Sequence, residues 1–142
     1  LLIIIVALIL TINLFISIQG LKSIKFNKNL KLFSLLKSNF DEIKNAVWYS
    51  IPYRVATYPV SLGYGKKTID YQNGNHSKEI NKLYFSNYPF LKWDKEILKT
   101  NKISHVIVEN VHEGTAVKLC DFSTDNLKLI DKNSEFTIYK LK

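Results

Sequence analysis

The feature that most constrains this chain is its opening run, residues 1–21, which contains no charged side chain. At about 1.5 Å of helix rise per residue, such a segment crosses a hydrocarbon core about 30 Å thick, and a helix satisfies its own backbone hydrogen bonds in lipid. Thr11 and Asn13 are polar but uncharged, and such groups are tolerated in membrane helices. The alternative, a buried helix of a soluble protein, would need a large core around a helix that is apolar on every side. We therefore predict a transmembrane helix over residues 1–21.

The start of the chain affects how this helix is interpreted. The sequence begins with Leu1 and contains no Met. A signal peptide would show a basic region before the apolar run and a small-residue cleavage site after it, whereas Ser17–Gly20 is a poor cleavage site. We expect the helix to be the last span of a longer, multi-spanning protein; a truncated single-span anchor would have the same sequence.

The net charge of +8 is concentrated just after the apolar run. Six lysines against Asp41 and Glu42 give +4 over Lys22–Lys44, and the chain from Val47 onward also carries +4 over about four times that length. We expect the lysines to contact anionic lipid headgroups, each contributing roughly 1 kcal/mol. A nucleic-acid partner is not expected, because this basic segment lacks Arg and the chain shows no nucleic-acid-binding module.

Residues 22–45 are predicted to form a basic amphipathic, juxtamembrane helix. Apolar residues recur there at steps of three and four, which places them on one face of a helix. The helix either lies at the membrane interface, docks on the following domain, or is simply that domain's first helix. The segment Asn39–Glu42 could interrupt it. The predicted apolar face consists of Phe26, Leu30, Phe33, Leu36, Phe40, Ile43 and Val47.

Residues 46–142 are predicted to form a small extramembrane, Rossmann-like α/β domain with a mixed sheet and a terminal β-hairpin. The near-continuous apolar run Ile103–Glu109 is typical of a strand covered on both faces. A helix over Tyr53–Leu62 would be short or broken near Pro59, and the lone Cys120 is expected to be a small buried apolar residue. The other predicted strands are Ala46–Ser50, Lys67–Tyr71, Leu127–Ile130 and Phe136–Leu141, and the predicted helices are Trp93–Lys102 and Thr115–Asp121.

Three residues past the most buried strand are candidates for a binding site. Glu109, His112 and Glu113 follow the carboxyl end of that strand, where ligands gather in open α/β sheets. A His between two carboxylates could bind a metal or transfer a proton, but the spacing matches no metal motif. A solvated, structural role is the alternative, and Gly114 suggests a loop or a cap.

Two further groups of residues are candidate sites. Tyr53, Arg54 and Tyr58 place the chain's one arginine among aromatic rings, a combination that could hold a phosphate or a sugar; a structural ion pair is the alternative. Asn75-His76-Ser77 matches the N-glycosylation pattern, which requires an extracytoplasmic loop. No nucleophile elbow, glycine-rich phosphate loop or paired carboxylates are present, so no catalytic residue, metal or cofactor is expected in this part of the protein.

The order of these segments resembles the C-terminal tails of multi-spanning C-type-fold glycosyltransferases, relatives of protein mannosyltransferases and of lipid A aminoarabinose transferase. The resemblance covers the apolar span, the strand Ala46–Ser50, the Tyr-Arg and Tyr-Pro stretch, ILKTNKISHVIVEN and NLKLIDKNSEFTIYKLK. It implies a membrane enzyme of the cell envelope that transfers a sugar from a polyprenyl-phosphate donor to a glycan, lipid or protein acceptor. The catalytic acidic residues would lie in an early loop outside this chain, and the tail would be extracytoplasmic and non-catalytic.

Three observations leave alternatives open. The lysines that directly follow the apolar run favour a cytoplasmic tail, whereas the resemblance places it outside. A membrane-tethered binding domain without enzymatic activity would have one span and a ligand patch near Arg54 or His112. A pilin-like subunit is disfavoured, because its apolar helix usually carries an early acidic residue and residues 1–21 contain none.

Overall fold

The computed structural model describes residues 11–13, 27–68 and 90–142, with the side chains of Tyr53, Arg54, Tyr58 and Ile97 excepted. Of the predicted membrane span, this includes the helical residues 11–13. Among the described residues there is no helix that combines the length and the apolar character needed to cross a bilayer.

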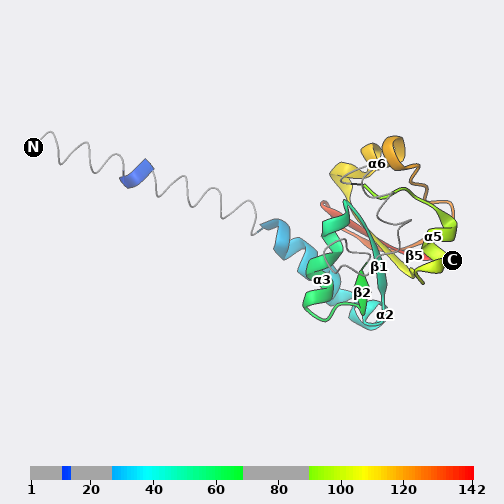
Figure 1. Cartoon of the computed structure of the whole chain (residues 1–142). Helices are drawn as coiled ribbons and strands as arrows, with labels where there is room; N and C mark the ends of the chain where they lie inside the picture. Colours follow the sequence, from blue (N-terminus) through cyan, green and yellow to red (C-terminus); the bar gives the residue numbers. More distant parts are fainter. Residues whose placement is uncertain (1–10, 14–26, 69–89) are drawn as a thin grey trace, which may run out of the picture.

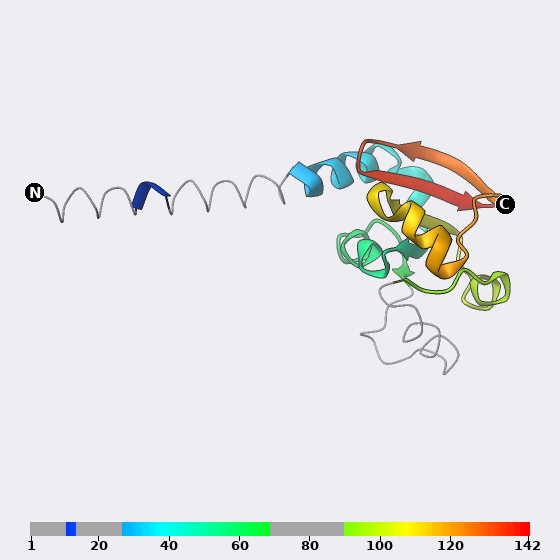
Figure 2. The same ribbon diagram turned by 90° about the horizontal axis from the view of Figure 1, so that it is seen from above.

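Within the described residues, five strands form one mixed sheet in the order β2-β1-β3-β5-β4, with β3 at its centre. β1 runs parallel to β2 and β3, and β5 runs antiparallel to β3 and β4. The β4–β5 hairpin forms the edge opposite β2 (Figure 2). The strands are β1 (Val47–Ile51), β2 (Lys67–Thr68), β3 (His105–Glu109), β4 (Leu127–Lys132) and β5 (Phe136–Leu141). The predicted α/β class, mixed sheet and terminal hairpin are thus confirmed.

Helices cover both faces of this sheet (Figure 1). α5 (Lys95–Thr100) and α6 (Glu113–Cys120) pack on the face that presents Tyr49, Val106 and Val108. Residues 27–38, α2 (Phe40–Ile43) and the 3-10 turn η1 (Tyr53–Ala56) pack on the other face; α3 (Thr57–Ser61) follows η1. All five residues of β3 are consequently buried, as its continuous apolar run predicts.

The helix predicted over residues 22–45 is interrupted at Asn39, as the sequence suggested, and its predicted buried face is correct only in part. Leu36 and Ile43 are buried as predicted, whereas Leu30 and Phe40 are 47 % and 45 % exposed. The other buried leucines, Leu32 and Leu35, lie with Leu36 on one side of the segment 27–38, and Leu30 lies on the other side of the same segment. Only the exposure of Phe40 follows from the break at Asn39, because two short helices need not share one stripe of side chains.

Other local predictions are confirmed with small shifts in boundaries. Pro59 lies in the five-residue α3, so the helical stretch there is short. Cys120 is buried, and its thiol donates to the carbonyl oxygen of Ala116 at 2.9 Å. Gly114 lies within α6 and not in a loop. The predicted strand residues beyond Thr68 lie outside the described residues.

The turn before β2 is fixed by a close approach to Trp48. The Trp48 Nε1–H donates to the carbonyl oxygen of Tyr64 at 2.7 Å. Gly65 has φ +122°, and a Cβ at this position would lie 2.3 Å from Trp48 Nε1. A glycine is required there for both reasons.

Substitution of Leu36 tests the packing of the first helical segment. Leu36 is fully buried, so Leu36→Ala is expected to lower the free energy of unfolding by about 2–5 kcal/mol through lost burial and a residual cavity. Leu30→Ala removes an exposed side chain of the same type from the same helix and is expected to change it by less than about 0.5 kcal/mol. Urea unfolding of the full chain in neutral detergent, followed by circular dichroism, measures both. Equal losses for the two variants would contradict this packing.

Candidate functional site

The carboxyl ends of the parallel strands β1 and β3 form the point where the chain leaves the sheet in two directions. After β1 it continues into η1, on the face covered by residues 27–38. After β3 it continues through η3 (Asn110–His112) into α6, on the opposite face. Such a divergence opens a crevice between the two strands, and ligands of open α/β sheets bind there. The position predicted for a site is therefore present.

Glu109 ends β3 at this crevice and is held by two neighbouring groups. Its side chain is 10 % exposed, and its carboxylate forms an ion pair with the ammonium group of Lys28. The Nε2 atom of His112 lies 3.7 Å from the same carboxylate oxygen, an attractive arrangement when the imidazole is protonated. The Lys28 ammonium group also lies 6.0 Å from the centroid of the Phe136 ring. The alternative of a solvated position does not hold for Glu109, because β5 and the helical segment 27–38 cover it.

A hollow of about 210 Å³ lies against this ion pair. It is smaller than the roughly 300–1,000 Å³ typical of sites for drug-sized ligands. The hollow is too small for a sugar carried on a long prenyl chain. Its lining residues are Lys28, Asn29, Leu32, Pro52, Val55, Glu109 and Phe136.

Asn110, which the sequence analysis did not single out, anchors the hairpin beside this crevice. Its backbone N–H donates to the carbonyl oxygen of Glu135 at 2.8 Å, and its side-chain amide donates to that of Asn133 at 2.9 Å. The hydroxyl of Thr137 donates to Asn110 Oδ1 at 2.7 Å. These hydrogen bonds give Asn110 a structural role.

Of the other predicted site residues, His112 alone is brought to this crevice by a contact among the described residues. Tyr53 and Arg54 lie in η1 and Tyr58 lies in α3, but their side chains are outside the described part of the structure. Asn75 lies outside the described residues altogether. His112 is 40 % exposed and packs against the ring of Phe90, and Glu113 begins α6 at the surface. No group of three or more His, Cys, Asp or Glu residues able to hold a metal occurs among the described residues.

His105, at the opposite end of β3, is a buried polar residue that was not predicted as a site. Its Nδ1 atom lies 2.8 Å from the hydroxyl of Ser104, and its ring packs against Trp48. Its Nε2 atom is buried without a hydrogen-bond partner among the described residues. Burial lowers the pKa of His105, and the ammonium group of Lys140 lowers it further, against the opposing effect of Glu42. This residue is therefore suited to packing in its neutral form.

Comparisons of the chain with protein-family models, with curated proteins and with solved structures gave no match.

The ion pair at the crevice can be tested by a pair of matched substitutions. Glu109→Gln removes the charge from a nearly buried carboxylate and leaves Lys28 without its counter-charge, so we expect a loss of about 1–2 kcal/mol in the free energy of unfolding. Glu135→Gln breaks the more exposed pair with Lys31, and we expect a loss of less than about 0.5 kcal/mol. Urea unfolding at low salt measures both losses. An equal or larger loss for Glu135→Gln would show that Glu109 does not hold the helical segment.

The lowered pKa of His105 predicts a pH dependence of stability. The unfolded state, with a His pKa of about 6.5, binds the proton before the folded state does. Stability is therefore expected to be fully present above about pH 6.5 and to fall as the pH is lowered toward the folded-state pKa. His105→Gln should flatten this part of the curve of unfolding free energy against pH. Parallel curves for the wild type and the variant between pH 8 and pH 5 would rule out this contribution.

Proposed function

We propose that this chain is the C-terminal part of an integral-membrane glycosyltransferase of the cell envelope that uses a polyprenyl-phosphate sugar donor. In this proposal residues 1–21 are the last transmembrane helix, and the Rossmann-like α/β domain is an extracytoplasmic accessory module without catalytic residues. The sugar donor and the glycan, lipid or protein acceptor bind to the part of the protein that precedes this chain.

The observation that carries the proposal is the docking of residues 27–38 onto the domain. Leu32, Leu35 and Leu36 lie in the same core cluster as Trp48 and Ile138 of the sheet. The segment that follows the apolar run is thus built into the domain's hydrophobic core and is not a flexible linker.

Polar contacts reinforce this docking along the same helical segment. The ammonium group of Lys28 pairs with Glu109, and that of Lys31 lies 3.0 Å from Glu135 Oε1. The side-chain amide of Asn133 donates to the carbonyl oxygen of Lys31 at 2.8 Å. Two of the six lysines expected to contact lipid headgroups are therefore engaged by the domain, so attachment to the bilayer depends mainly on the apolar run.

The ion pair of Glu109 is compatible with a non-catalytic domain. Glu109 is the most buried carboxylate at the crevice, and its charge is already engaged by Lys28. A carboxylate in a stable ion pair is a poor general base.

The second candidate, a membrane-tethered binding domain with no enzymatic activity, is favoured by the hollow at the crevice beside His112.

A charge in the apolar run tests the membrane attachment. Ile12 is 50 % exposed, so Ile12→Arg would be tolerated in water, whereas an arginine at the centre of a membrane helix costs about 2.5–3.5 kcal/mol of insertion free energy. We expect Ile12→Arg to shift the protein from the alkali-resistant membrane fraction toward the supernatant. Leu119→Arg, at a similarly exposed position of α6, is the matched control and should leave fractionation unchanged. Recovery of the wild-type protein in the supernatant would refute the membrane assignment.

Upstream sequence separates the two candidate functions. A glycosyltransferase tail requires many preceding spans and acidic residues in the first large extracytoplasmic loop. A start codon directly before Leu1 would leave the tethered binding domain as the surviving candidate.

A further inference from the structure

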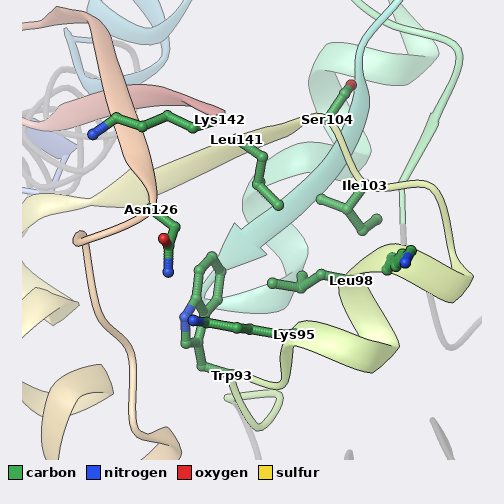
Figure 3. A pocket seen from close by; sticks show the side chains of 9 residues that line it. Trp93, Lys95, Leu98, Ile103, Ser104, Asn126, Leu141 and Lys142 are labelled. Atoms are coloured by element: carbon green, nitrogen blue, oxygen red, sulfur yellow. The ribbon is translucent and has the colours of Figure 1, made fainter.

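A second hollow, of about 480 Å³, lies at the amino-terminal end of β3, at the far end of the strand from Glu109. Its size falls within the range of small-molecule sites, which the crevice at Glu109 does not reach. Figure 3 shows its side chains, which come from the segment before α5, from α5 itself, from the loop before β3 and from the two ends of the hairpin. The lining residues are Trp93, Lys95, Leu98, Lys99, Ile103, Ser104, Asn126, Leu141 and Lys142.

The walls of this hollow are apolar and rigid. Leu98 and Ile103 are 2 % and 7 % exposed and belong to the core, and Leu141 packs against the same cluster. The indole of Trp93 is held edge-to-face between Tyr49 and Phe122, at centroid distances of 5.3 and 5.0 Å. Because this ring is already fixed by packing, binding a flat apolar group against it would cost little conformational entropy.

The polar groups at the hollow are almost all hydrogen-bond donors. Lys95 points toward Trp93, and the side-chain amide of Asn126 faces the indole from the hairpin (Figure 3). Among the described residues Lys95 and Lys99 form no ion pair, and none of the lining residues is acidic. The nearby Asp94 accepts a hydrogen bond from the backbone N–H of Glu96 at 2.8 Å and so caps the start of α5. Lys142 lines the hollow, but its ammonium group points away from Trp93 (Figure 3).

We propose that this hollow binds a small organic anion with an apolar body, such as an aryl or alkyl phosphate. The anionic group would lie at the ammonium group of Lys95, within reach of the Asn126 amide, and Lys99, which also lines the hollow, would add positive charge. The ring or chain would lie against Trp93, Leu98 and Leu141. The site is independent of the proposed membrane function, since it needs neither the apolar run nor an enzyme upstream.

The test uses 2-naphthyl phosphate and isothermal titration calorimetry on the full chain in nanodiscs of neutral phosphatidylcholine. In this proposal both the phosphate group and the naphthyl ring contribute to binding. Inorganic phosphate and 2-naphthol should therefore each bind at least about tenfold more weakly than 2-naphthyl phosphate. The double variant Lys95→Ala, Lys99→Ala should lower the affinity for naphthyl phosphate by about tenfold or more and leave the affinity for naphthol unchanged. Lys118→Ala, which removes an exposed lysine of α6 outside the hollow, is the matched control and should leave both affinities unchanged.

The outcomes that would overturn the proposal are distinct. Equal affinity for inorganic phosphate and naphthyl phosphate would mean that the apolar walls are not used. A loss for Lys118→Ala as large as that for the double variant would indicate a diffuse charge effect. No heat of binding with any of the three probes would exclude the site.

Discs that contain phosphatidic acid distinguish two sources of the anion. Loss of naphthyl phosphate binding in these discs would mean that a lipid headgroup competes for the site, and unchanged binding would mean that the ligand is a free molecule.

Discussion

The structure depends on burying both faces of its central strand. Val106 and Val108 face the core under α5 and α6, whereas Ile107 faces the core under residues 27–38. A strand that is apolar on both faces must be covered by two layers. The layer on the second face is completed by the helical segment that precedes β1. This requirement makes that segment part of the fold.

The parts of the fold that could be predicted from the sequence are those that leave a local pattern of apolar residues. The run Ile103–Glu109 identifies β3, and the alternating strands around Asp131–Ser134 identify the hairpin, because each pattern is local. The buried residues Leu32, Leu35 and Leu36 also follow a local i, i+3, i+4 spacing, but this pattern does not continue past Asn39. At Asn39 the chain turns, and the Asn39 side chain donates both to the carbonyl oxygen of Leu35 and to Asp131 of β4. A contact with a residue so distant in the sequence leaves no periodic signal.

The candidate crevice illustrates the same limit. Glu109 and His112 could be predicted, since they follow a buried strand by a few residues and the carboxyl ends of strands are the usual place for sites. Lys28 could not be predicted, because it pairs with Glu109 across 81 residues and belongs to a run of lysines with the appearance of a lipid-binding surface. Burial of the carboxylate follows from that pairing. A rule about topology locates a crevice but does not say whether its charged groups are already engaged.

The two ends of β3 differ in this respect. At the carboxyl end, the charge of Glu109 is compensated by a lysine of the same chain, and the adjoining hollow is small. At the amino end, Lys95 and Lys99 border a hollow more than twice as large whose lining residues include no acid. A ligand gains binding energy from groups that the folded chain leaves without partners, because groups paired within the chain must first be separated. Recognition of a small anion is therefore favoured at the end of the sheet that the general rule for α/β folds would not select.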